Sequence, residues 1–277
     1  MLLRPDRETN NAFIYCLVEA AQRSGITVLL TCAMSNHHHT VIYDREGRYP
    51  EFVEHFHKLL ARSQNALRGR WENFWSSEQV SVVRLIDREA VIDKLVYTAT
   101  NPVLGDLVDR VHHWPGVNGL RVLLTGRVLR ASRPRHFFRS NGRMPEAVEM
   151  RLTIPPELGP EAEVLATLRE RVQAVEAAHE EARRRTGRRV FGRRAVLQQS
   201  WRAQPASVEP RRTLRPRIAG RNKWSRLEAL LRDRVFVEDY AQARDAWREG
   251  IVVPFPPGTY WLRRFANVVV AEAVAEA

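Results

Sequence analysis

The sequence predicts an α+β fold in which helices cover an antiparallel sheet, and two observations carry this prediction. Apolar residues recur at helical spacing over 10–24 and 50–69, whereas 26–33 and 37–43 are short runs rich in β-forming side chains. The expected order is helix, strand, strand, helix, strand, helix. With one further strand at the front, this order gives βαββαβ, the ferredoxin-like or RRM-like plan.

Local signals place the remaining elements of the first half. Tyr49-Pro50 opens the second helix, since proline is favoured in a first helical turn. A third strand is expected over 80–85, followed by a helix over 88–100. Asp87 is suited to cap this helix, and Pro102 is expected to stop it.

The first strand of the βαββαβ plan has little room. Only residues 1–4 precede the loop into the first helix. We therefore expect that Met1 is a misassigned start or that the protein is truncated, which would leave the central sheet short.

The segment Ser35-Asn36-His37-His38-His39-Thr40 lies at the start of the second predicted strand. Because side chains alternate along a strand, His37 and His39 are expected on one face and His38 on the other. Two imidazoles side by side on a sheet form a ready bidentate metal site. A His-x-His pair alone is more often incidental than metal-binding, so a second signal is needed.

The second signal is Tyr97-Thr98-Ala99-Thr100-Asn101-Pro102, which lies at the predicted helix end. Residues four apart share a helix face, so Tyr97 and Asn101 project together. A lone tyrosine on a helix is usually a half-buried core residue. Presented toward two histidines, however, a phenol and an amide oxygen indicate metal-assisted attack on a phosphodiester.

These segments resemble two motifs of the single-tyrosine HUH transposases, which include insertion-sequence and REP-associated tyrosine transposases. Met34-Ser35-Asn36-His37-His38-His39 resembles their M-P-N-H-x-H strand, and Tyr97-Thr98-Ala99-Thr100-Asn101-Pro102-Val103 resembles their Y-x-x-x-N-P-V helix end. The resemblance covers roughly residues 1–120. Ser35 stands where the family usually has proline, and His38 stands where it has a hydrophobic residue. His38→Val is therefore expected to be tolerated.

The resemblance implies a transposase that nicks and rejoins single-stranded DNA. Tyr97 would be the catalytic nucleophile, keeping the 5′ phosphate as a phosphotyrosine and releasing a 3′ hydroxyl. His37, His39 and Asn101 would bind Mg²⁺ or Mn²⁺, and no other cofactor is implied. The substrate would be hairpin or inverted-repeat ends of a mobile element. The enzyme would be a homodimer in the bacterial cytoplasm, associated with the nucleoid. In insertion-sequence members the tyrosine helix can pack against the partner's histidines.

Composition agrees with an enzyme that acts on nucleic acid. The 277 residues are 44% hydrophobic and carry a net charge of +12, and no apolar run reaches membrane-spanning length. Residues 1–120 hold 13 Lys and Arg against 14 Asp and Glu, so the positive excess lies in residues 121–277. This second region is predicted to be Arg-rich, mostly helical and DNA-binding. Codon usage in a GC-rich genome is the alternative explanation for the preference for arginine.

Within the basic region, a long charged helix is predicted over 160–188, and an extended Pro/Arg-rich loop over 199–220. A dense arginine cluster at the end of this helix is expected to contact phosphate, and it comprises Arg183, Arg184, Arg185, Arg188 and Arg189.

Other candidates are weaker. His55 and His57 fall in a predicted helix, where residues two apart diverge. Trp114 follows His112-His113 in a turn-rich stretch and is expected to anchor a loop, although an exposed tryptophan there could stack on DNA bases. The two cysteines have neither metal-ligand nor disulfide spacing.

Three functions from different classes fit these observations. The first is an active transposase or single-strand endonuclease, which the retention of both histidines, Tyr97 and Asn101 favours. The second is a domesticated DNA-binding protein whose catalysis has decayed, which the short N-terminus favours. The third is a metal-binding or RNA-binding module, and the lack of an aromatic RNP-type strand weighs against it.

Overall fold

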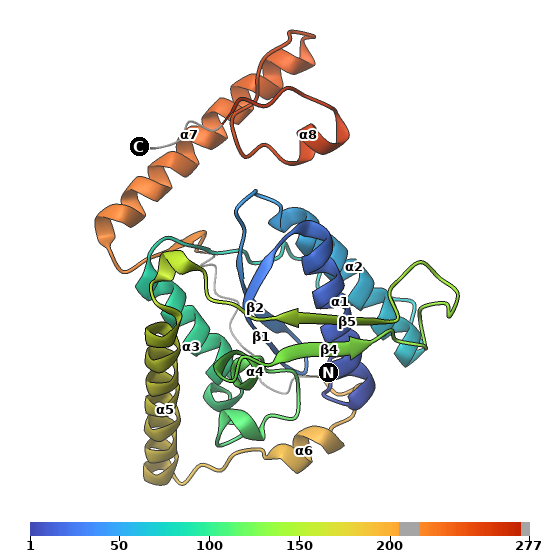
Figure 1. The fold of residues 1–277 in the computed structure, drawn as a ribbon, viewed down its shortest axis with the longest axis vertical. Coiled ribbons are helices and arrows are strands. Elements are labelled where there is room, and N and C mark those ends of the chain that lie inside the picture. The colour runs from blue at the N-terminus through green and yellow to red at the C-terminus, as the bar shows by residue number, and fades with distance from the viewer. Residues whose placement is uncertain (205–215, 273–277) are drawn as a thin grey trace.

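The computed structural model describes residues 1–204 and 216–272, and it is a mixed α/β protein (Figure 1). The helices are α1 (Arg7–Ser24), α2 (Tyr49–Arg68), α3 (Arg88–Leu104), α4 (Leu120–Leu124), α5 (Glu161–Thr186), α6 (Arg193–Gln198), α7 (Lys223–Arg248) and α8 (Trp261–Phe265). The strands are β1 (Thr27–Ala33), β2 (His38–Tyr43), β3 (Arg84–Leu85), β4 (Val128–Ser132), β5 (Ala147–Arg151) and β6 (Ile218–Ala219). Single 3-10 turns lie at Val111–His113 and Pro156–Leu158.

The β1–β2 hairpin lies at the centre of the molecule. The two strands are antiparallel, and Cys32 pairs with His39. Later segments add backbone hydrogen bonds to β1: Gly119 N donates to Thr31 O (2.8 Å), and Thr153 N donates to Val28 O (3.4 Å). β1 is buried along almost its whole length, whereas β2 is mostly half-buried. The hairpin therefore presents the start of β2 at the edge of the core.

Helix α1 packs against α2 and against the β4–β5 hairpin (Figure 1). It begins at Asp6, whose side chain accepts a hydrogen bond from Thr9 N (2.8 Å), and it ends at Gly25 in the left-handed conformation. One hydrophobic core runs through all of these elements and through α3 and α5, so that Leu30 and Leu168 belong to the same buried cluster. The core therefore crosses the boundary that the sequence predicts at residue 120.

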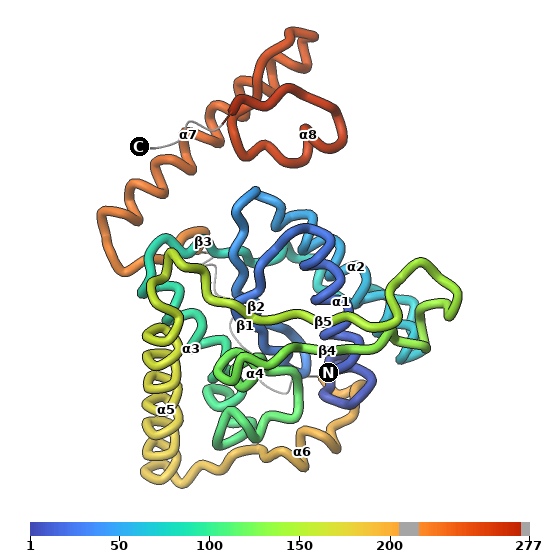
Figure 2. Tube along the Cα trace, viewed as in Figure 1, coloured from blue at the N-terminus to red at the C-terminus, as the bar shows by residue number. Residues whose placement is uncertain are grey.

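The third predicted strand differs most from expectation. Only Arg84–Leu85 of the segment 80–85 is a strand, and it pairs in parallel with β6 rather than with the β1–β2 hairpin (Figure 2). Val80 and Val82 are each 44% exposed. Among the described residues no strand pairs with them, and propensity alone does not specify a sheet.

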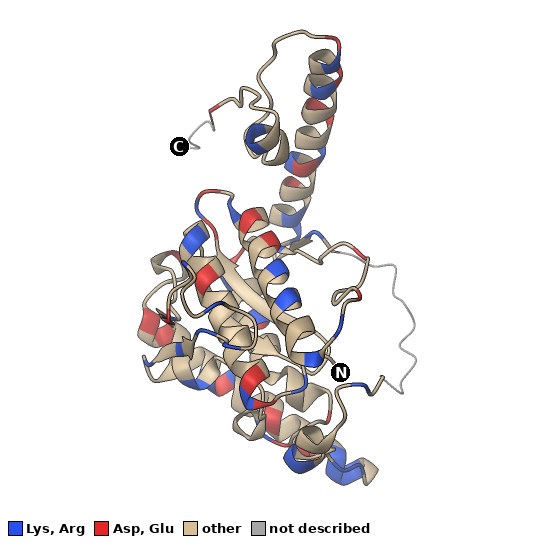
Figure 3. Ribbon diagram, turned by 90° about the vertical axis from the view of Figure 1, so that its right-hand side faces the viewer, with Lys and Arg blue, Asp and Glu red and all other residues tan. Residues whose placement is uncertain are grey.

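The C-terminal helices stand apart from the rest of the molecule. Helix α7 projects away from the body, and α8 lies beside it (Figure 1). Basic and acidic side chains are interspersed along α7 (Figure 3), although the region as a whole was predicted to be basic. Arg264 Nη1 lies 3.3 Å from Glu54 Oε2 and links this part to α2. Part of the loop predicted over 199–220 falls at 205–215, outside the described residues.

The helices within residues 1–204 and 216–272 include none that is both long enough and apolar enough to cross a membrane.

Candidate active site

The start of β2 and the second half of α3 bring four predicted residues together. The imidazoles of His37 and His39 lie side by side, with ring centroids 5.0 Å apart, as the alternation of strand side chains predicts. The Tyr97 ring lies edge-on to His39, with centroids 5.2 Å apart. The Asn101 amide nitrogen is 3.2 Å from His39 Nε2. All four side chains belong to one chain, so the tyrosine helix packs against the histidines of its own chain.

Helix α3 is held firmly where it carries this site. Asp87 caps it by accepting a hydrogen bond from Ala90 N (2.7 Å). Arg171 of α5 and Arg221 both bind Asp93, with nitrogen–oxygen distances of 3.0 and 2.7 Å. On this fixed helix Tyr97 is 42% exposed, whereas Asn101 is buried. The site therefore combines a solvent-accessible phenol with a buried amide.

The predicted end of this helix is wrong. Pro102 lies inside α3, which continues to Leu104, so Asn101 is a helical residue rather than the last one before a stop. Proline has no backbone N–H to donate, and its ring crowds the preceding turn. Next to this turn, the side chain of Asn118 donates to Ala99 O (2.8 Å) and gives its carbonyl a partner from outside the helix.

His38 faces the opposite side of β2, but its surroundings are not those of a hydrophobic residue. Its Nε2 lies 2.9 Å from His57 Nε2, so one of the two nitrogens donates to the other. Its ring meets Phe56 and Trp75 edge-on, with centroids 5.2 and 5.8 Å away. Burial, followed by the charge of His57, lowers the pKa of His38 to about 3. The premise that His38 occupies an apolar position without a partner is therefore wrong.

This contact reverses the expected effect of His38→Val. Valine would leave His57 Nε2 without its partner in a half-buried aromatic cage, and an unsatisfied buried polar group costs about 1–3 kcal/mol. We expect the free energy of unfolding, measured by urea denaturation, to fall by roughly that amount. His112→Val, at an exposed histidine, is the control and should change stability by less than about 0.5 kcal/mol. A His38→Val variant as stable as the control would restore the original expectation.

The electrostatics keep His39 available as a ligand. Burial, followed by the charges of His37 and Lys94, lowers the pKa of His39 to about 4. The imidazole is therefore neutral at pH 7 and has a lone pair to offer. Lys94 also lies over the Tyr97 ring, with its Nζ 5.4 Å from the centroid. A cation thus stands over the ring of the phenol.

The residues present fit a divalent cation of the magnesium or manganese type. His37 Nδ1 lies 2.7 Å from Asn36 Oδ1, which favours a proton on Nδ1 and a lone pair on Nε2. Asn101 Nδ2 lies 3.2 Å from His39 Nε2, a hydrogen-bond distance that places the amide beside the nitrogen that would bind the metal. Amide nitrogen and oxygen are interchangeable by a flip of the group, so Asn101 Oδ1 can take the ligand position.

This amide is the third ligand that the sequence predicts. Over the described parts of the chain, no three His, Cys, Asp or Glu side chains are arranged to hold a metal ion. The donor set at β2 and α3 is thus two imidazoles and one amide oxygen, which leaves further coordination positions for phosphate and water.

The arginine cluster at the end of α5 is only partly available to phosphate. Arg183 is buried, and its Nη1 lies 3.4 Å from Asp106 Oδ1. Arg188 Nη1 binds the same carboxylate at 3.2 Å. Arg184, Arg185 and Arg189 are exposed, the first two with acidic partners one turn earlier. We therefore remove Arg183 from the set of expected phosphate contacts, because its guanidinium joins α5 to the loop after α3.

The weaker candidates have structural roles. His55 pairs with Glu19, and His57 points to His38, so these two histidines diverge as predicted. Trp114 is buried, and its Nε1 donates to Ala33 O (3.0 Å). It anchors its loop, as predicted, but a buried ring cannot stack on DNA.

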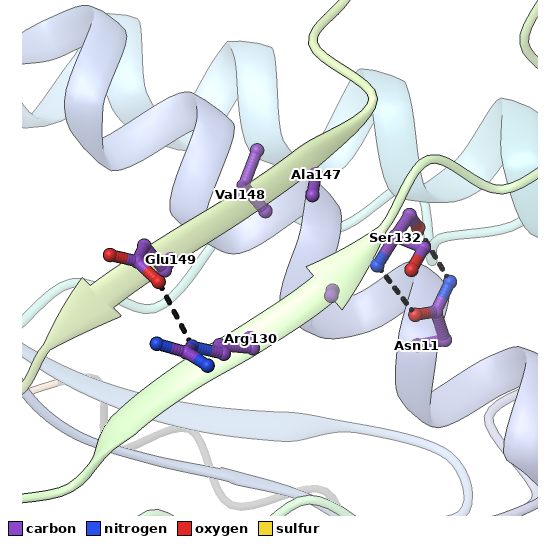
Figure 4. Close-up of a pocket in the computed structure, with 7 residues that line it drawn as sticks. Asn11, Arg130, Ser132, Ala147, Val148 and Glu149 are labelled. Atoms are coloured by element: carbon purple, nitrogen blue, oxygen red, sulfur yellow. Dashed lines mark hydrogen bonds and ion pairs between the residues drawn. The ribbon is translucent and has the colours of Figure 1, made fainter.

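A hollow of about 580 Å³ lies where α1 meets the β4–β5 hairpin (Figure 4). Its main polar groups are paired with one another: Arg130 with Glu149, and Asn11 with the backbone of Ser132. These pairings satisfy the side chains that a ligand would need, so the hollow does not compete with the histidine site.

Comparison with known proteins adds no relative. The sequence matched no family model, and comparison with curated proteins and with solved structures found no significant match. The candidate site therefore rests on its two motifs and on the geometry that joins them.

Sequence reasoning missed three residues around the site. Lys94 precedes Tyr97 by three residues on a helix, a spacing that could have been noticed. His57 and Trp75 form the cage behind His38, and no local pattern links them to the histidine strand.

Proposed function

We propose that the protein cuts and rejoins single-stranded DNA, with Tyr97 as the nucleophile. The observation that carries this proposal is the convergence of His37, His39 and Asn101 on the face where Tyr97 is exposed. Hairpin or inverted-repeat ends are the proposed substrates, and the bacterial cytoplasm is the proposed location. We further propose a homodimer, and a ferredoxin-like plan for the histidine and tyrosine domain.

In this mechanism the phenol of Tyr97 loses its proton to solvent, and its oxygen attacks the phosphorus atom of the scissile bond. The 3′ oxygen of the preceding nucleotide leaves and takes up a proton, while the 5′ phosphate remains on Tyr97. His37, His39 and Asn101 would hold Mg²⁺ or Mn²⁺, which supplies charge neutralisation at the phosphate oxygens. Lys94 contributes a second positive charge next to the phenol. The phosphotyrosine keeps the energy of the broken bond, so rejoining requires only attack by a 3′ hydroxyl.

The polarity of the covalent product tests the function. Full-length protein is incubated with hairpin oligonucleotides that carry randomised single-stranded flanks, with Mn²⁺ present. An oligonucleotide labelled at its 3′ end should give a protein adduct that survives denaturing electrophoresis, whereas a 5′ label should appear only on the released fragment. Binding without any adduct would leave the non-catalytic DNA-binding protein as the better description.

The exposed arginines of the α5 cluster make a separate prediction on salt dependence. Replacing Arg184, Arg185 and Arg189 with glutamine should make the plot of log affinity against log salt less steep. Each lost phosphate contact reduces the magnitude of the slope by about 0.7 for a single strand, so three lost contacts reduce it by up to about 2. The measurement is fluorescence anisotropy with a labelled single strand. The control replaces Arg226, Arg234 and Arg248 of α7, which are also exposed. Equal slopes for both triple variants would mean that overall charge, and not this cluster, sets the affinity.

A further inference from the structure

A second cavity adjoins the histidine site and has no role in the proposed cleavage step. It has a volume of about 350 Å³, and its lining includes Asn36, Arg70, Phe74, Trp75, Trp201 and Arg202. Two tryptophans and two arginines thus border one cavity. They come from the loop after α2 and from the segment after α6.

The cavity adjoins one proposed metal ligand directly, and it also borders the residue between the two histidines. Asn36, which lines it, lies 2.7 Å from His37 Nδ1 through its side-chain oxygen. The Trp75 ring, which also lines it, is 5.8 Å from that of His38, the residue between the two proposed ligands. Because His38 faces the opposite side of β2 from His37 and His39, only the Asn36 contact leads to the proposed metal site, and a nucleotide held in the cavity would lie next to His37.

The aromatic walls of the cavity are held in place. Trp75 stacks on His57, with centroids 4.6 Å apart, and its Nε1 donates to His57 O (3.0 Å). Trp201 is half-buried, and the guanidinium of Arg202 lies 5.0 Å from the centroid of its ring. Rigid aromatic faces bind unpaired bases by stacking, which does not depend on the base sequence.

The arginines supply the complementary charge. Arg70 Nη2 binds Glu72 at 2.9 Å, but its buried Nε has no hydrogen-bond partner among the described residues. Arg202 is exposed at the mouth of the same cavity.

We propose that this cavity binds one unpaired base of the single-stranded DNA, close to the nucleotide that is cut. Trp201 stacks on the base in place of the guanidinium that lies over its ring, Trp75 lines the same cavity, and Arg70 and Arg202 contact the adjoining phosphate. The proposal rests on the proposed function for the identity of the strand. The cavity's own binding chemistry, however, requires neither the metal nor Tyr97.

The first test measures binding without cleavage, in EDTA, by anisotropy of a labelled single-stranded oligonucleotide with full-length protein. Trp201→Ala should weaken binding about 5- to 100-fold, the range expected for the loss of one base stack. Trp201→Phe keeps a stacking face and should recover most of the affinity. Trp71→Ala is the matched control: Trp71 is 97% exposed on the same loop as Trp75 and does not line the cavity. Equal affinities for Trp201→Ala and Trp71→Ala, or failure of Trp201→Phe to recover binding, overturn the proposal.

A second test locates the base. A single abasic site is moved along the oligonucleotide, and each version is titrated against wild-type protein and Trp201→Ala. At one position the abasic site should weaken binding to the wild type. It should not weaken binding to Trp201→Ala any further, because the base missing there is the one that stacks on the Trp201 ring. If the loss of affinity caused by the abasic site adds to the loss caused by Trp201→Ala at every position, the assignment is overturned.

The two proposals fail separately. If wild-type protein forms no adduct but the Trp201 effects appear, cleavage is wrong and the base site stands. If the adduct forms and Trp201→Ala binds as tightly as wild type, cleavage stands and the base site is wrong.

Discussion

Tyr97→Phe should abolish covalent capture of DNA while leaving affinity for single strands within about twofold. The substitution removes only the attacking oxygen, because the ring that packs against His39 is retained. A residue that acts as nucleophile has no substitute in the chemical step, whereas its contribution to ground-state binding is small. The measurement is the adduct formed with 3′-labelled hairpin DNA and Mn²⁺, together with anisotropy in EDTA.

The chain offers a matched control for this variant. Tyr49 is 39% exposed, close to the 42% of Tyr97, and lies at the start of α2. Tyr49→Phe should form the adduct at the wild-type rate. Tyr43 is another candidate, but it is half-buried and its hydroxyl donates to Glu157 (2.6 Å). An adduct that persists in Tyr97→Phe and disappears in Tyr43→Phe or Tyr49→Phe would move the nucleophile to that residue.

The parts of the site that the sequence predicted are those set by local periodicity. Strand alternation places His37 beside His39 whatever surrounds the hairpin, and helical spacing places Asn101 one turn after Tyr97. That these two elements meet could be inferred only from the resemblance to a family, because His39 and Tyr97 are 58 positions apart in the sequence. The structure supplies the contact that joins them.

What the sequence could not predict depends on partners distant in the chain. His38 looked like a departure from an apolar pattern, but it pairs with His57, on a helix whose own spacing indicates no contact with β2. Arg183 looked like part of a phosphate-binding cluster, but Asp106 lies within reach of its guanidinium. In both cases the sequence shows that the side chain is polar or charged. Its burial and its neutralising partner depend on the tertiary structure.

The position of the tyrosine helix bears on the proposed dimer. Because Tyr97 lies against His39 of its own chain, each subunit holds a complete set of the proposed residues. The proposed residues can therefore meet within one chain, without a contribution from a second subunit.

His39→Ala should reduce the cleavage rate about 10³-fold, and His37→Ala should have an effect of similar size. Each variant removes one of two imidazoles from the proposed metal site, and metal stabilisation of the transition-state charge is worth several kcal/mol. The measurement is the single-turnover rate of adduct formation over a range of Mn²⁺ concentrations. Affinity for DNA in EDTA should stay within about threefold, because the phosphate-binding arginines are untouched.

The control for this prediction is His112→Ala, at an exposed histidine outside the site, which should cleave at the wild-type rate. Mixing His39→Ala with Tyr97→Phe extends the test to the arrangement of the subunits. Because both side chains act within one chain, the mixture should remain inactive. Recovered activity would show that Tyr97 of one subunit reaches the histidines of another. Full activity in His39→Ala alone would remove this imidazole from the mechanism, and with it the metal site that His37, His39 and Asn101 are proposed to form.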